Sequence, residues 1–170
     1  MALTIFGTLP KGPRLEKIKT SPNYKNGAFQ NLSDTPMKPE GISYFTMMRK
    51  FFFGKPKFAT PLHPLPFVKT DLTTIADSTI VWFGHSSYLL RINGKNILVD
   101  PVFSGNASPF SFMVKAFKGA NEYSVDDMPQ IDLLLLTHDH YDHLDYKTIL
   151  ALQPKVKTIF CSLGVGRIRE

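Results

Sequence analysis

Short runs of hydrophobic residues typical of β-strands dominate the middle of the chain. Residues 79–83 are rich in β-branched and aromatic side chains, and residues 88–92 and 96–100 continue this pattern. Asn93-Gly94 joins the last two runs, and this dipeptide favours a type I′ turn because both of its residues readily adopt positive φ. The pattern therefore predicts three consecutive strands that pair antiparallel.

Three later segments complete the predicted core. Residues 131–137 form a nearly uninterrupted apolar run, as expected of a buried strand, and residues 156–161 form another β-type run. Residues 146–152 are predicted to form a short helix with Asp145 as its N-cap. Strands in a meander followed by strand–helix–strand predict a mixed α+β fold built in layers.

Proline separates the first part of the chain from this core. Residues 1–69 contain nine of the thirteen prolines, which break helices and central strands. We expect an extended proline-rich N-terminal arm over residues 1–69 and a folded domain over residues 70–170. One short helix is expected within the arm, over residues 42–53.

The arm is also strongly basic. Residues 1–69 hold 11 Lys and Arg against 3 Asp and Glu, whereas residues 70–170 hold 9 against 11. This charge suits an anionic partner such as lipid headgroups, a phosphorylated substrate or nucleic acid, although a solvated basic arm is the simpler interpretation. Residues 47–53 are both aromatic and basic, which fits either peripheral membrane contact or, as we favour, an anchor for the arm. No recognition module for nucleic acid is visible, so nucleic acid is not expected as a partner.

Length and composition narrow the class of protein. The chain has 170 residues, of which 43% are hydrophobic, so a domain with a core is expected. Its single cysteine, Cys161, cannot form an intrachain disulfide, and we expect it to be a small hydrophobe within a strand. The sequence shows neither a signal peptide nor an apolar stretch near the ~18–20 residues of a membrane span. The expected location is cytoplasmic, with membrane association as the alternative.

The chemistry is concentrated at the end of the 131–137 run. His138, His140, Asp142 and His143 lie within six residues there. Neutral imidazoles and a carboxylate suit zinc, and other first-row divalent metals are possible. A tight loop cannot direct all four side chains at one ion without strain. The pattern therefore predicts two adjacent ions, one bound by His138 and His140 and the other by Asp142 and His143. A polar surface loop is the alternative, which the apolar run leading into the cluster disfavours.

The segment 137–143 resembles the signature of the metallo-β-lactamase superfamily. The order of the predicted elements fits the first half of the αββα sandwich of that superfamily. Residues 82–87, residues 100–109 and residues 131–146 also resemble the N-acyl-phosphatidylethanolamine phospholipase D branch. The resemblance covers roughly residues 79–152.

The resemblance implies a two-metal hydrolase, usually with zinc, in which a metal-bound hydroxide attacks phosphorus or a carbonyl group. It assigns His138 and His140 to the first ion and Asp142 and His143 to the second. Asp100, at a strand end, would orient a ligand histidine from behind. His85 would line the pocket, with a hydrogen-bonded core histidine as the alternative. Asp142 and His85 are the candidate catalytic residues.

The resemblance further implies a phosphodiesterase that acts on a small-molecule or phospholipid-like substrate. A lactone, ester or phosphorylated small-molecule hydrolase of the same fold is one alternative, and an inactive metal-binding fragment is another. The superfamily supplies further ligands downstream, whereas no histidine follows His143. We therefore expect an N-terminal half whose missing ligands come from an oligomer or from a complementing C-terminal half.

Overall fold

The computed structural model describes residues 10–36, 38–54, 56–108 and 114–165. The chain divides into two compact units, one made of residues 10–62 and the other containing residues 63–165. The smaller unit holds two helices and a two-stranded sheet, namely α1 (Pro13–Lys19), β1 (Tyr24–Lys25), β2 (Ala28–Phe29) and α2 (Tyr44–Phe53).

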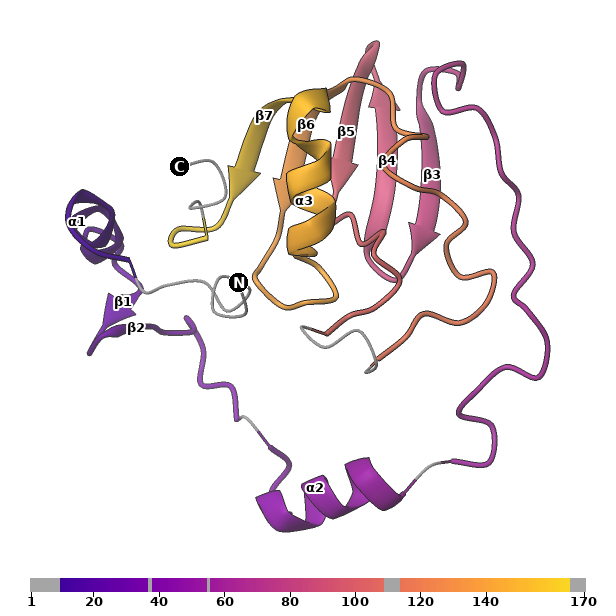
Figure 1. Ribbon diagram of the computed structural model, residues 1–170. Helices are drawn as coiled ribbons and strands as arrows, with labels where there is room; N and C mark the ends of the chain where they lie inside the picture. The colour runs from indigo at the N-terminus through magenta and orange to yellow at the C-terminus, as the bar shows by residue number, and fades with distance from the viewer. Residues whose placement is uncertain (1–9, 37, 55, 109–113, 166–170) are drawn as a thin grey trace. The chain divides into compact units, whose positions relative to one another are not determined.

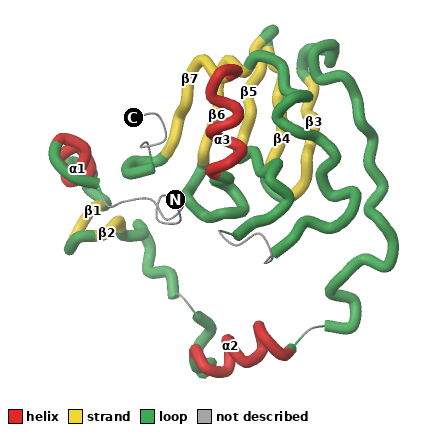
Figure 2. Tube along the Cα trace, in the orientation of Figure 1, coloured by secondary structure: helices red, strands yellow, loops and turns green. Residues whose placement is uncertain are grey.

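A five-stranded sheet forms the larger unit, with its strands in the order β3-β4-β5-β6-β7 (Figure 1). The strands are β3 (Thr79–Gly84), β4 (Ser87–Ile92), β5 (Lys95–Val99), β6 (Ile131–Leu136) and β7 (Val156–Cys161). The first three pair antiparallel, whereas β5 with β6 and β6 with β7 pair parallel. The helix α3 (Tyr146–Leu152) lies against one face of this sheet (Figure 2). This confirms the predicted α+β architecture.

The hairpin between β4 and β5 turns at Asn93-Gly94, as predicted. The φ angles of Asn93 and Gly94 are 52° and 68°, which is the pair of positive values that a type I′ turn requires. The Asp77 carboxylate accepts a hydrogen bond from the Gly94 N–H at 2.9 Å. The turn fixes the register, so that Leu89 lies opposite Leu98.

The core lies between the sheet and α3. Leu89, Leu98 and Leu134 lie in register across three strands, and each is fully buried. Ile149 and Leu152 of α3 belong to the same buried cluster. Burial of one such leucine contributes about 1.5–3 kcal/mol, so this row of side chains fixes which face of the sheet is covered.

The smaller unit holds more local structure than its prolines predict. The helix α1 was not predicted, and it begins with Pro13 because a proline at the first helical position needs no N–H donor. The β1–β2 hairpin was also missed, although Asn26-Gly27 carries the same turn signal as Asn93-Gly94, with φ angles of 54° and 82°. The predicted helix over residues 42–53 is present as α2, which begins at Tyr44 because Ser43 caps it.

The single cysteine and the length of the apolar helices can also be compared with the sequence. Cys161 ends β7 and is partly buried. Among the described residues, no helix has the length and apolar character needed to cross a bilayer.

Candidate metal centre

The site is built where two neighbouring parallel strands end. Asp100 follows β5, and Thr137 follows β6. The Asp100 side chain is 1% exposed and accepts hydrogen bonds from the Thr137 N–H at 2.8 Å and from the Thr137 hydroxyl at 2.6 Å. Because a buried carboxylate is costly unless it is hydrogen-bonded, these donors tie the ends of the two strands together.

Asp100 also orients His143. The Nδ1 atom of His143 lies 2.8 Å from Oδ2 of Asp100. A proton on Nδ1 completes this hydrogen bond and leaves the Nε2 lone pair free to bind a ligand or a metal. This is the arrangement by which a carboxylate fixes the tautomer and the ring orientation of a metal-binding histidine.

The Thr137 hydroxyl favours the same tautomer in a second histidine, His138. The hydroxyl has one proton, which is donated to Asp100, so its oxygen acts as an acceptor toward other groups. His138 Nδ1 lies 3.0 Å from that oxygen. The proton of His138 is therefore favoured on Nδ1, and its Nε2 is left with a free lone pair.

His85 belongs to the tight turn between β3 and β4. Gly84 has a φ of 109°, and a Cβ at this position would lie 2.8 Å from the Ala120 carbonyl oxygen, so only glycine fits without a shift. His85 itself has a positive φ of 46°, and its carbonyl accepts a hydrogen bond from Trp82 Nε1 at 2.9 Å. Its side chain is 61% exposed, which excludes the alternative of a core histidine.

Three ligand atoms converge at this point. Single ligand atoms of His85, Asp142 and His143 all lie within 4.8 Å of one another. Oδ2 of Asp142 lies 3.0 Å from His85 Nε2 and 3.9 Å from His143 Nε2. Two imidazole nitrogens and a carboxylate oxygen form a donor set that zinc accepts, so the residues present fit a divalent metal ion.

The charge of Asp142 suits the same role. Partial burial alone would raise the pKa of its carboxyl group, but its own backbone N–H and the neighbouring His143 and His85 together hold that pKa below its ordinary value. The carboxylate is therefore ionised at neutral pH and available to a cation.

His138 and His140 lie beside this three-residue set. The His138 ring centroid is 3.8 Å from that of His143 and 4.7 Å from that of His140. The His85 ring centroid lies 5.1 Å from that of His143 on its other side. The structure thus brings all of the predicted site residues into one neighbourhood. It groups His85, rather than His138 or His140, with Asp142 and His143.

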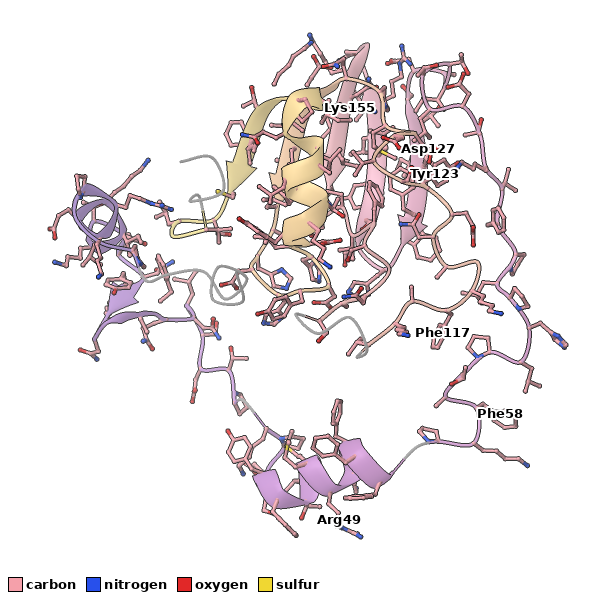
Figure 3. All side chains as sticks on the ribbon, in the orientation of Figure 1. Arg49, Phe58, Phe117, Tyr123, Asp127 and Lys155 are labelled. Carbon is pink, nitrogen blue, oxygen red and sulfur yellow. The ribbon has the colours of Figure 1, made fainter. Side chains whose placement is uncertain are left out.

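A cavity of about 1160 Å³ opens beside the cluster, within the larger unit. His85 and Asp142 line it at the site, and apolar side chains that include Phe67, Trp82 and Phe117 line much of the remainder. Figure 3 labels Phe117 and Tyr123, two of the aromatic residues of this wall. The cluster therefore borders a space that suits a molecule with a large apolar part.

Sequence reasoning missed the residues that support Asp100 and the metal loop. Ser87 is buried, and its hydroxyl donates to the Asp100 carbonyl and accepts from the Val102 N–H. Asp145 was predicted only as a helix cap, yet its carboxylate also accepts from the Ser104 N–H at 2.8 Å. The role of Thr137 could have been suspected from its position, because it is a hydroxyl residue between the buried strand β6 and the first histidine of the cluster.

Part of the chain, which includes most of this centre, is similar to a known family. Residues 95–170 match the family described as "Beta-lactamase superfamily domain". Asp100, Thr137 and the cluster His138–His143 all fall within the matched part, whereas His85 precedes it. The mixed sheet agrees with the metallo-β-lactamase-like fold that the sequence predicted, of which the chain covers part.

Individual relatives match along different lengths of the chain. An uncharacterised protein of Mycobacterium tuberculosis is 33% identical over 152 residues, which are 86% of this chain and 40% of that protein. The N-acyl-phosphatidylethanolamine-hydrolyzing phospholipase D 1 of Caenorhabditis elegans is 36% identical over 89 residues, 51% of this chain and 25% of that protein. A UPF0173 metal-dependent hydrolase of Lawsonia intracellularis is 37% identical over 68 residues, 40% of this chain and 24% of that protein. The chain thus spans less than half the length of each of these relatives.

Proposed function

We propose that this chain carries part of the metal centre of a metal-dependent hydrolase that cleaves a phosphodiester. The observation that carries the proposal is the convergence of His85, Asp142 and His143, with ligand atoms within 4.8 Å of one another, at the edge of a largely apolar cavity. The match to the beta-lactamase superfamily domain and to a relative named as a metal-dependent hydrolase supports it.

Zinc is the proposed metal, with other divalent ions as alternatives. His85, Asp142 and His143 would hold one ion, and His138 with His140 would contribute to a second, as the sequence predicts for a two-metal site. A zinc ion supplies Lewis acidity and lowers the pKa of a coordinated water molecule. Asp100 would act as a positioning residue, because it contacts His143 through Nδ1 and leaves Nε2 facing the site.

The chain's own side chains account for the rest of the proposed chemistry. His85 Nε2 lies 3.0 Å from Asp142 Oδ2, and both residues line the cavity, so as ligands they would hold the ion next to a bound substrate. Aromatic and aliphatic walls would bind the apolar part of the substrate and exclude water from the reacting group. Two residues, Asp142 and His85, are therefore the proposed catalytic pair.

A phospholipid-like substrate is the leading proposal. The name of the C. elegans relative describes hydrolysis of a phospholipid, and the apolar cavity suits an acyl group. A lactone or ester carrying an apolar chain fits the same cavity and is the second candidate. A third candidate is an inactive metal-binding fragment that requires a second half, because the chain spans less than half of its relatives.

Hydrolysis of bis(4-nitrophenyl) phosphate tests the proposal. We expect zinc-dependent release of nitrophenol that a chelator stops and that His140→Ala and His143→Ala each reduce by about 100-fold or more. His63→Ala is the matched control, because His63 is the histidine outside the cluster, and it should retain full activity. Unchanged activity in His143→Ala would contradict the assignment.

Two other results would select the alternatives. Turnover of a lactone or a nitrophenyl ester, without turnover of the phosphodiester, identifies the second candidate. A folded, zinc-loaded chain without turnover of any of these substrates identifies the inactive fragment, and recovery of activity on adding a C-terminal polypeptide of a relative would establish it.

A further inference from the structure

One segment of the smaller unit combines aromatic and basic residues and has no acidic residue. Residues 41–62 contain four Lys and Arg, no Asp or Glu, and five phenylalanines. The helix α2 lies within this segment and begins at a capped N-terminus, where Ser43 Oγ accepts a hydrogen bond from the Thr46 N–H at 3.1 Å. The metal centre makes no use of this segment.

The apolar side chains of α2 are largely exposed. No residue of the helix is buried. Phe45 is 78% exposed, Phe51 70% and Phe53 83%, and Phe52 and Met48 are also more than half exposed. A contiguous apolar patch of this kind on the surface of a domain marks a site of interaction, because leaving it in water is unfavourable.

Most of the apolar side chains of α2 lie on one side of the helix, the basic residues flank that side, and Phe53 lies outside it. At about 100° per residue, the following six side chains fall within an arc of roughly 160°: Tyr44, Phe45, Met47, Met48, Phe51 and Phe52. Arg49 follows one edge of this arc, and Lys50 follows the other. Figure 3 shows the Arg49 side chain extending outward from α2. A helix that lies in a membrane interface has this arrangement, because long basic side chains at the flanks reach the headgroups while the apolar face enters the lipid.

The residues that follow α2 are also aromatic and basic. Phe58 is 80% exposed, and Lys57 Nζ lies 5.6 Å from the centre of its ring. A partner protein would be expected to offer acidic side chains to these cations, whereas an anionic bilayer satisfies the cations and the aromatic face together.

We propose that α2 and residues 56–58 dock on the surface of an anionic lipid bilayer. The apolar arc of α2 enters the boundary between headgroups and acyl chains, and Arg49, Lys50 and Lys57 contact the anionic headgroups. This inference goes beyond the proposed hydrolase activity, since it concerns a surface outside the metal centre.

Sedimentation with lipid vesicles tests the proposal on the complete 170-residue chain. Vesicles of phosphatidylcholine with about 30% phosphatidylserine should bind the chain, and pure phosphatidylcholine vesicles should bind it about 10-fold more weakly. Raising the salt concentration should reduce the difference. The double variant Phe51→Ser/Phe52→Ser should lose about 10-fold or more of the binding.

Matched variants separate this surface from general stickiness. Phe29→Ser removes an exposed aromatic ring of the same unit outside α2 and should bind like the wild type. Arg49→Gln/Lys50→Gln should reduce the preference for phosphatidylserine, because only Lys57 of the three contacting cations remains. Lys17→Gln/Lys25→Gln changes the net charge equally on α1 and β1 and should retain the preference. Circular dichroism of each variant verifies that the fold persists.

Several results would overturn the proposal. These are an absence of binding to phosphatidylserine vesicles, equal binding by Phe51→Ser/Phe52→Ser, and, in place of vesicle binding, self-association that Phe51→Ser/Phe52→Ser abolishes. Loss of vesicle binding in His143→Ala would show that lipid is held at the metal centre instead. Vesicle binding that survives in His143→Ala while hydrolysis is lost keeps the two proposals distinct.

Discussion

At the residue scale, Asp100 and Thr137 decide which nitrogen atoms of two histidines face the site. Asp100 accepts two hydrogen bonds from Thr137 and lies 2.8 Å from His143 Nδ1. The Thr137 oxygen, whose proton is donated to Asp100, is left to accept from His138. One buried carboxylate therefore sets the tautomers of His143 directly and His138 through a hydroxyl.

Asp100→Asn tests this positioning role. The amide keeps the shape of the carboxyl group, but its NH₂ cannot accept a hydrogen bond, so one of the donors is left unpaired. We expect zinc affinity, measured by calorimetric titration, to fall about 10–100-fold and the free energy of unfolding to fall by about 1–3 kcal/mol. Asp71→Asn, on an exposed turn, is the control. Wild-type zinc affinity in Asp100→Asn would rule out the role.

The sequence predicted the ligands clustered after β6 better than it predicted His85. His138, His140, Asp142 and His143 are close in sequence, so their local spacing alone indicated a metal cluster. His85 lies far from them in sequence, and its approach depends on sheet pairing and on the turn that Gly84 permits. No local pattern encodes that meeting, which is why the sequence left His85 between two interpretations.

At the element scale, the regular core followed the local patterns closely. The alternating and apolar runs predicted β3 to β7, and the Asn93-Gly94 turn fixed the hairpin register. The parallel pairing of β5 with β6 has no local signal, because a long connection separates these strands. α1 was missed because Pro13 was interpreted as a helix breaker rather than as a first helical residue.

Asp145 links two elements, and its loss should affect both. Its carboxylate caps α3 through the Thr148 N–H and hydroxyl, and it also holds the Ser104 N–H of the loop after β5. Asp145→Ala should lower the free energy of unfolding by about 1–3 kcal/mol in urea titration. Ser43→Ala removes a cap from α2, which has no buried residue, and should cost less. Equal losses in both variants would contradict this account.

Asp132 joins three strands and gives a pH-dependent contribution to stability. Lys157 Nζ at 2.8 Å is the main cause that lowers the pKa of its carboxyl group to about 2, followed by the Asn96 N–H. Since the folded pKa lies below the ordinary value of 3.8, the stabilisation is present above about pH 4 and is lost as the pH falls toward 2.

Asp132→Asn should therefore destabilise the chain at neutral pH by about 1 kcal/mol after solvent screening. The difference from wild type in thermal midpoint should shrink as the pH is lowered below about 4. A difference that stays constant from pH 6 to pH 3 would show that the Asp132 charge is not its source.

At the scale of the whole molecule, the sheet presents a second apolar face. Ile80 is 67% exposed, Trp82 68% and Phe160 61%, and the strand register sets all three opposite the face that holds Leu89 and Leu98. The chain spans 40% of its M. tuberculosis relative. We propose that this face associates with a second copy of the chain.

Self-association should follow from this exposed face. We expect sedimentation velocity to show a mass that rises with protein concentration, and Ile80→Lys/Phe160→Lys to reduce that rise. Leu150→Lys is the control, because Leu150 is 42% exposed on α3, at the other face. A monomer at all concentrations, or an equal effect of Leu150→Lys, would contradict the proposal.

The central claim is that the end of β6 forms a metal centre with His85. The most direct test is a zinc titration of wild type, His85→Ala, His143→Ala and His63→Ala, each verified by intact mass and circular dichroism. The account predicts that His85→Ala and His143→Ala weaken zinc binding by about 10-fold or more, whereas His63→Ala binds like wild type. Equal zinc affinity in all four proteins would contradict it.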